Sequence, residues 1–107
     1  MVKKSIDRKI MESIKKYIEK ISKYYKIEAI ILFGSYAKGT QHADSDIDIA
    51  IITNDIKNDI FDEELNLMRL RRDIDTRIEP HLIRIEDYKN ADTPFIQEII
   101  DTGIKVA

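Results

Sequence analysis

Residues 27–53, IEAIILFGSYAKGTQHADSDIDIAIIT, contain two apolar runs that are separated by a polar loop. The first run predicts a buried strand, and the Gly34-Ser35 pair after it predicts a tight turn that opens a short helix. The second run predicts another strand, which opens with Asp46 and Asp48. Alternate residues of a strand point to the same face, so both carboxylates are expected on one side of the sheet. Because unpaired charge is costly to bury, this pair predicts a cation-binding site.

The size and composition of the chain limit the classes of protein that it can form. A length of 107 residues predicts a single domain over residues 1–107. The absence of cysteine excludes disulfides, thiolate zinc sites and thiol nucleophiles. No apolar run approaches the roughly 20 residues that span a bilayer, and no signal peptide is recognisable. We therefore expect a cytoplasmic protein that has no contact with a membrane.

Charge is distributed unevenly along the chain. Residues 1–26 contain nine Lys/Arg and three Asp/Glu, whereas residues 27–107 contain nine and seventeen, respectively. The simplest interpretation is that the basic residues of the first helix form its solvent-exposed face. The same pattern is compatible with attraction to a polyanion or to an acidic partner.

Apolar periodicity predicts an α/β (α+β) fold, with a small mixed sheet of about three strands flanked by helices. A first helix over about residues 5–24 is indicated by isoleucines at three- and four-residue spacing, with Ser5 as its N-cap. In the strand over residues 46–53, Ile47, Ile49 and Ile51 are expected to face one side and the two aspartates the other.

Further elements are expected in the second half of the chain. A helix over about residues 60–71 precedes a third strand over 74–83, in which Pro80 indicates an edge strand because proline lacks a backbone donor. Residues 84–90 predict a loop or a short helical turn, and Thr93-Pro94 predicts the start of the last helix. The residues of the 60–71 helix that are expected to face inward are Phe61, Leu65 and Met68, together with Leu67 and Leu70.

A third carboxylate is expected close to Asp46 and Asp48. Two carboxylates at alternate strand positions are roughly 7 Å apart at their Cα atoms and can converge on one Mg²⁺, which prefers oxygen ligands and substrate phosphates. Asp75 on the third strand is the expected third ligand, and Glu79 on the same strand face is the fallback. Three acids can hold two ions, an arrangement that favours phosphoryl or nucleotidyl transfer.

The turn after the first strand supplies a second half of the expected site. Gly34 lets the backbone approach a phosphate closely, and the Ser35 hydroxyl can donate to a phosphate oxygen. Lys38, in the short helix, and Arg77, beside Asp75, are further candidates for binding the nucleotide. A Gly-Ser pair alone is a weak signal, but its combination with the later acids is specific.

These motifs carry a resemblance to a known family. The segment GSYAKG at residues 34–39, followed by SDID at 45–48, resembles the signature of the DNA polymerase β-like nucleotidyltransferase superfamily. The stretch RRDIDTRI at residues 71–78 resembles the strand that carries the third catalytic acid, which gives that role to Asp75. The small size is similar to that of the minimal nucleotidyltransferases (MNT).

The resemblance implies a nucleotidyltransferase fold and an enzyme that transfers a nucleoside monophosphate, AMP from ATP in the expected case, to a hydroxyl. Asp46, Asp48 and Asp75 would then be the catalytic residues and the ligands of two Mg²⁺ ions. The resemblance further implies a helical HEPN-type partner, often a toxin RNase. In such pairs the MNT protein is the antitoxin, and some members transfer AMP to a tyrosine of the toxin.

Two other functions fit the same residues. One is a nucleotidyltransferase with a small-molecule acceptor such as an aminoglycoside, and the other is a binding module that neutralises its partner while its nucleotide site stays idle. No acceptor-binding domain is recognisable, so substrate recognition is expected from a partner or from a homo-oligomer. The edge of the third strand and the amphipathic first helix are candidate contact surfaces, and direct binding of nucleic acid is not expected.

Overall fold

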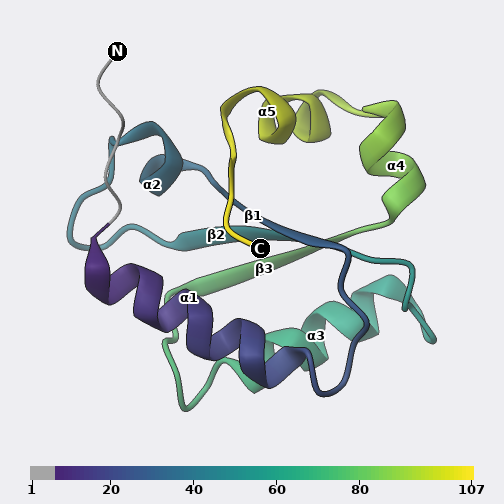
Figure 1. Ribbon diagram of the computed structural model, residues 1–107, viewed down its shortest axis with the longest axis horizontal. Helices are drawn as coiled ribbons and strands as arrows, with labels where there is room; N and C mark the ends of the chain where they lie inside the picture. Colours follow the sequence, from purple (N-terminus) through teal and green to yellow (C-terminus); the bar gives the residue numbers. More distant parts are fainter. Residues whose placement is uncertain (1–6) are drawn as a thin grey trace.

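A computed structural model describes residues 7–107 and shows a mixed sheet with helices on both faces (Figure 1). The strand order is β3-β2-β1-β4, so the predicted mixed sheet is confirmed, with four strands instead of about three. In chain order the elements are α1 (Arg8–Ile21), β1 (Ala29–Phe33), α2 (Ser35–Lys38), β2 (Ile47–Ile52), α3 (Ile60–Leu70), β3 (Ile78–Ile83), α4 (Ile85–Asn90), α5 (Pro94–Thr102) and β4 (Ile104–Lys105).

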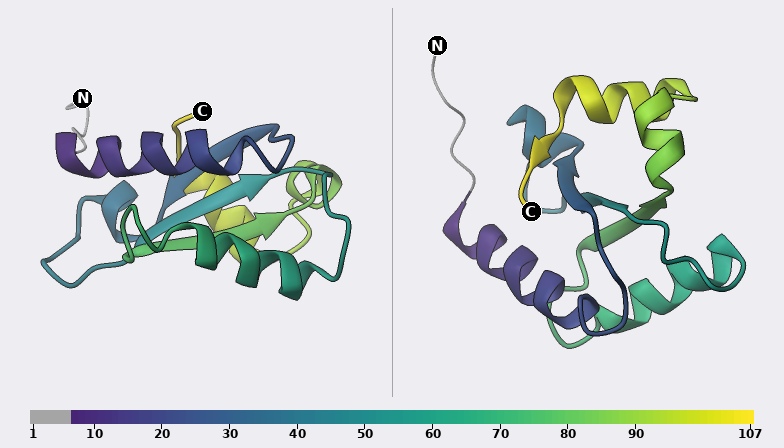
Figure 2. Two further views of the ribbon diagram at one scale, coloured as in Figure 1. Left: turned by 90° about the horizontal axis from the view of Figure 1, so that it is seen from below. Right: turned by 45° about the vertical axis from the view of Figure 1, so that its right-hand side comes forward.

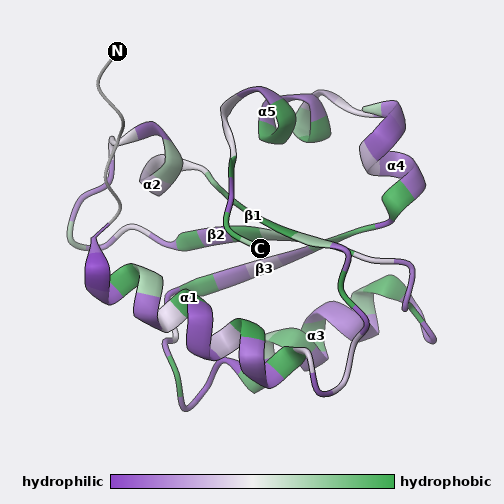
Figure 3. Cartoon of the chain, viewed as in Figure 1, coloured by the Kyte–Doolittle hydropathy of each residue, from purple (hydrophilic) through white to green (hydrophobic). Residues whose placement is uncertain are grey.

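The two faces of the sheet are covered by different helices. β1 pairs antiparallel with β2 and β4, whereas β2 pairs parallel with β3. Figure 2 shows α1 and α3 on one side of the sheet and α4 and α5 on the other. Ile47, Ile49 and Ile51 face α1 and α3, while Ala50 and Ile52 pack with α5, as the alternation in the sequence predicts. Figure 3 shows the strands as largely hydrophobic and the helices as mixed, which is typical of amphipathic helices on a buried sheet.

Helix α1 is shorter than expected, but it buries the predicted stripe. Its N-cap is Asp7, whose side chain accepts a hydrogen bond from the Lys9 amide at 2.7 Å. The expected cap, Ser5, lies outside the described residues. The isoleucine stripe continues through Tyr17, which is fully buried and donates to the Leu67 carbonyl at 2.6 Å. This hydrogen bond ties α1 to α3.

Helix α3 has the predicted bounds within a residue, but its inward face differs from the prediction. Phe61 is 64% exposed and Leu65 is 42% exposed, so the expectation that they face inward is wrong. Leu67 is fully buried, as expected, and Glu63 is buried beside it on the same face. Glu63 Oε1 accepts from the Tyr25 hydroxyl at 2.9 Å and Oε2 from the Lys57 amide at 3.1 Å. This face turns inward because Leu67 and the partly buried Ile60 and Leu70 pack on the core, and the polar contacts of Glu63 satisfy its buried carboxylate.

Strand β3 begins four residues later than the sequence predicts. Residues 71–77 form turns, and the amide of Asp75 donates to the Arg71 carbonyl at 3.0 Å. The Asp75 carboxylate accepts from the backbone amide of Arg77 at 3.0 Å, which stabilises a turn in competition with extended structure. The prediction that Asp75 lies on the strand is therefore wrong. Pro80 does lie on an edge strand, as expected, because β2 is the one strand among residues 7–107 that pairs with β3.

Side chains of α3 contact the outer edge of β3. The Leu82 amide donates to Glu64 Oε2 at 2.9 Å, and the Arg71 guanidinium donates to the Ile78 carbonyl at 2.5 Å. α3 therefore covers both a face of the sheet and part of its open edge.

The C-terminal region contains elements that the sequence predicted only in part. Residues 85–90 form a helix, one of the two alternatives expected there. The Thr93 side chain caps α5 by accepting from the Ile96 amide at 3.1 Å, as the Thr-Pro pair predicts. The short strand β4 after α5 was not predicted; it pairs with β1. Within residues 7–107, none of the helices has the length and apolar character needed to cross a membrane.

The orientation of α3 can be tested with two leucines of the same helix. We expect Leu67→Ala to lower the free energy of unfolding by about 2–5 kcal/mol, because it leaves a cavity in the core. Leu65→Ala removes a half-exposed side chain, and we expect a change of about 0.5 kcal/mol or less. Urea denaturation of both variants measures the difference. Equal losses would contradict the orientation described here.

Candidate active site

The site lies where β1 ends and β2 begins. In the antiparallel register Phe33 is paired with Asp48, so the next residue of the chain, Gly34, lies against the aspartate. Gly34 has a φ of 75°, in the region that favours glycine. A Cβ at this position would lie 2.5 Å from Asp48 Oδ2. Gly34 is therefore needed both for its backbone conformation and for the close approach of the Asp48 carboxylate.

The two aspartates differ in their environments. Asp46 is exposed just before β2, whereas Asp48 is on the strand with 27% of its side chain exposed. Burial raises the pKa of the Asp48 carboxyl above its usual value, His81 opposes this shift, and the negative charge of Asp46 adds to it. The ionised pair is therefore an energetic cost to the fold in the absence of a cation.

The sequence predicts Asp75 and Glu79 on one strand, but only Glu79 lies on β3. Asp75 lies in the turn before β3 and makes two contacts with Arg77, from Nε to Oδ1 at 3.1 Å and from Nη2 to Oδ2 at 2.9 Å. The hydrogen bond from Arg77 lowers the pKa of the Asp75 carboxyl. Glu79, in contrast, is the register partner of Asp48 in the parallel β2–β3 pair, so the two side chains leave the same face. Glu79, the fallback candidate, is thus aligned with Asp48 on the neighbouring strand, and its Oε2 atom lies 3.6 Å from Arg71 Nη1.

The expected phosphate-binding residues surround the same end of the sheet. Gly34 is the N-cap of α2 and Ser35 is its first residue. Lys38, at the end of α2, contacts Glu98 Oε1 of α5 at 3.0 Å. Both expected cationic residues, Lys38 and Arg77, thus contact a carboxylate in this structure.

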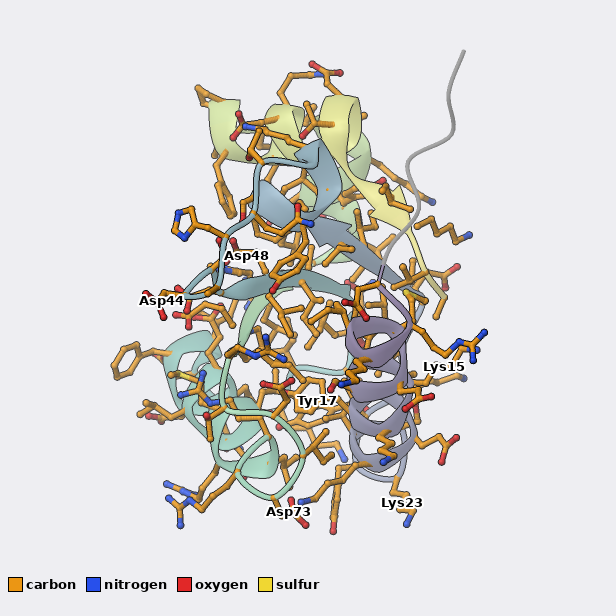
Figure 4. The ribbon with its side chains drawn as sticks, turned by 90° about the vertical axis from the view of Figure 1, so that its left-hand side faces the viewer. Lys15, Tyr17, Lys23, Asp44, Asp48 and Asp73 are labelled. Carbon is orange, nitrogen blue, oxygen red and sulfur yellow. The ribbon has the colours of Figure 1, made fainter. Side chains whose placement is uncertain are left out.

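Another acidic residue of the turn after α3 does not take part in the site. Asp73 is exposed and pairs with Lys20 of α1. Figure 4 looks onto the side of the molecule that carries Asp48 and shows Asp73 well separated from it. Asp73 is therefore not part of the site around Asp48.

His81 also lies at the site, although the sequence motifs described above do not include it. Its Nε2 atom lies 3.5 Å from Asp48 Oδ1. Its ring contacts Phe33 with centroids 5.1 Å apart and Phe95 with centroids 5.6 Å apart. The alternation of β3 puts His81 on the same strand face as Glu79, and this signal was available in the sequence, but only a parallel pairing with β2 brings it to Asp48.

The donor set fits a magnesium ion that is shared with a substrate. Within residues 7–107, no group of three or more His, Cys, Asp or Glu side chains is arranged to hold a metal ion by itself. Asp46 and Asp48 offer hard carboxylate oxygens. A bound cation would offset both the repulsion between their charges and the cost of burying the ionised Asp48 carboxylate. Mg²⁺ is commonly bound in this way, by one or two carboxylates together with substrate phosphates.

Comparison with known proteins agrees with this geometry. Residues 12–107 match the family described as "Polymerase beta, Nucleotidyltransferase". The protein adenylyltransferase MntA of Shewanella oneidensis is 36% identical over 78 residues, which are 73% of this chain and 52% of that protein. The chain therefore spans about half the length of this relative. MJ0141 of Methanocaldococcus jannaschii is 28% identical over 99 residues, which cover 91% of this chain and 98% of that protein.

Solved structures share the fold. A crystal structure from Sulfolobus solfataricus has a TM-score of 0.65 at 17% identity, covering 90% of this chain and 78% of that one. A toxin–antitoxin structure with AMP-PNP has a TM-score of 0.58 at 26% identity, covering 91% of this chain and 72% of that one. From the matched residues and the turn-and-carboxylate geometry, the chain belongs to the polymerase β nucleotidyltransferase family, as a minimal nucleotidyltransferase.

Proposed function

We propose that this protein is a Mg²⁺-dependent adenylyltransferase that transfers AMP from ATP to a hydroxyl of a partner protein. The observation that carries the proposal is the placement of Asp48 against Gly34, with Asp46 beside it, at one end of the sheet. The relative from Shewanella oneidensis is named a protein adenylyltransferase, and the related toxin–antitoxin structure contains AMP-PNP, an ATP analogue. Both support ATP as the donor and a protein as the acceptor.

The partner that we propose is a helical HEPN-type toxin, which this protein neutralises as its antitoxin. The support is the 26% identity to a chain of a toxin–antitoxin structure. Under this proposal the partner supplies the acceptor hydroxyl, and the site described above binds and activates the ATP. The protein then acts in the cytoplasm, where ATP and the toxin meet.

The turn after β1 would bind the triphosphate. Gly34 has no side chain to obstruct a phosphate, and the Ser35 hydroxyl is a hydrogen-bond donor at the first position of α2. Lys38 and Arg77 would join the site by exchanging their carboxylate partners for phosphate oxygens. For the exposed Lys38–Glu98 pair such an exchange costs little, because exposed ion pairs contribute only about 0–1 kcal/mol.

The carboxylates would bind the metal ion and accept the proton of the acceptor hydroxyl. Asp46 and Asp48 would be the Mg²⁺ ligands, and we favour Glu79 over Asp75 as the third acid because it is the register partner of Asp48. Bound Mg²⁺ supplies charge neutralisation at the α-phosphate and activation of the acceptor hydroxyl. The third acid accepts the hydroxyl proton as the acceptor oxygen bonds to the α-phosphorus, and the bond to the bridging oxygen breaks with release of pyrophosphate.

Transfer of label tests the proposed activity. The protein, the product of the neighbouring gene and Mg²⁺ are incubated with ATP labelled in the α-phosphate. We expect label on the partner protein, and we expect the Asp46→Asn/Asp48→Asn double variant to reduce it to background because the metal ligands are lost.

The other outcomes of this experiment identify the competing functions. Label on an added aminoglycoside but not on the partner would indicate a small-molecule acceptor. Partner binding without label, unchanged in the double variant, would indicate a non-catalytic antitoxin. Asp44→Asn, in the exposed loop before the site, is the matched control for loss of a carboxylate.

Two single variants distinguish the third acid. We expect Glu79→Gln to lower kcat by about 10²-fold or more, the contribution that is typical of a general base. Asp75→Asn weakens the contacts of Asp75 with the amide and the guanidinium of Arg77 but removes no general base, and we expect it to retain kcat within about threefold. Steady-state kinetics of label transfer measures both. The reverse result would return the role to Asp75.

The stability of Asp48→Asn should depend on pH. The pKa of Asp48 is raised in the folded protein, so its ionised form destabilises the fold once the pH exceeds this pKa. The neutral asparagine lacks this cost, and we expect a higher Tm than wild type at pH 8 in EDTA. As the pH falls through the raised pKa toward the ordinary value of 3.8, the gain should vanish. Calorimetry that gives an equal or lower Tm for the variant at pH 8 would contradict this interpretation.

A further inference from the structure

We propose that His81 is a positioning residue that fixes the orientation of the Asp48 carboxylate toward its metal ion. The inference rests on the proposed metal site and assigns a role within it to a side chain of β3. It is carried by the surroundings of the two carboxylate oxygens and by the environment of the imidazole.

Each oxygen of Asp48 faces a different neighbour. Oδ2 lies against Gly34, close enough that even a methyl group on that residue would clash with it. Oδ1 faces His81 Nε2 at 3.5 Å. The carboxylate thus has the backbone after β1 on one side and an imidazole from β3 on the other.

The Nε2 atom of the imidazole faces the Asp48 carboxylate. Nε2 is buried and has no hydrogen-bond partner among the described residues, although 32% of the His81 side chain is exposed. A buried polar atom of this kind normally has a partner. A lone pair facing a carboxylate is unfavourable, so the tautomer with hydrogen on Nε2 is favoured.

The ring is held in this orientation by two aromatic side chains. Phe33 and Phe95 contact the imidazole, and they contact each other with ring centroids 5.5 Å apart. Phe33 is buried, so the imidazole rests on a fixed surface. A small rotation of Asp48 then suffices to shorten the 3.5 Å separation to a hydrogen bond, since contacts of this kind in free enzymes often tighten when ligands bind.

The role differs from that of a metal ligand or a base. A group that orients a metal-binding side chain acts through it, and removing such a group typically reduces metal affinity by about 10–100-fold. The donor, and not the charge of the imidazole, is what this role requires. Glutamine, which keeps an N–H donor, should therefore replace histidine in part.

Binding of Mn²⁺, measured by electron paramagnetic resonance with AMP-PNP present, tests the inference without catalysis. We expect His81→Phe, which retains a ring but no donor, to weaken Mn²⁺ binding by about 10–100-fold, and His81→Gln to stay within about fivefold of wild type. The KM for Mg²⁺ in label transfer should rise for His81→Phe while kcat at saturating Mg²⁺ changes little. His42→Phe, in the exposed loop, is the matched control and should bind Mn²⁺ like wild type.

The outcomes separate the two levels of the argument. If wild type binds Mn²⁺ and Asp46→Asn abolishes the binding, the proposed metal site stands; equal affinities of wild type and His81→Phe would then overturn the role of His81 alone. If His81→Phe and His81→Gln lose affinity equally, the donor is not what matters and the inference is overturned. Absence of Mn²⁺ binding to wild type would overturn the metal site and, with it, the inference. Thermal denaturation of each variant checks that the fold is retained.

Discussion

The site depends on one constraint, the antiparallel register between β1 and β2. This register pairs Phe33 with Asp48 and so brings the Gly34 backbone against the Asp48 carboxylate. A slip by one residue would turn Asp48 toward the α1–α3 core, where its charge would have no partner, so the hydrophobic pattern and the site specify the same register. The isoleucines that alternate with the aspartates therefore do more than build a core, because they fix where the carboxylates point.

Features that depend on local pattern could be predicted from the sequence. The alternation in β2 assigns its two faces correctly, and the Thr93-Pro94 pair marks the start of α5. The acids at the start of β2 and the glycine before α2 were also found in this way, because their spacing on a strand and around a turn is set by backbone geometry alone. Side-chain direction in a strand and capping at a helix end involve only neighbours along the chain.

The features that were missed depend on contacts between distant segments. The apolar stripe of Phe61 and Leu65 has helical spacing, but the face with Leu67 packs on the core, where the carboxylate of the buried Glu63 also finds hydrogen-bond donors. Asp75 follows a strand-like alternation, and its own side chain stabilises a turn instead. His81 reaches Asp48 only through a parallel pairing that no local pattern specifies. Local hydrophobic periodicity does not contain any of these contacts.

The outer edge of β3 shows how such a small sheet limits its own association. Ile47 and Thr53 donate to the carbonyls of Arg77 and Ile83, so the backbone groups of residues 78, 80 and 82 point away from β2. Of the three positions, residue 78 donates to the Asp75 carbonyl, Pro80 has no amide hydrogen, and residue 82 donates to a glutamate of α3. Within Ile78–Ile83, an extended segment of another chain would therefore find no backbone donor to pair with. Pairing of an added strand is therefore disfavoured along this edge, which leaves helix surfaces and the opposite margin beside β4 as the surfaces that a protein partner could recognise.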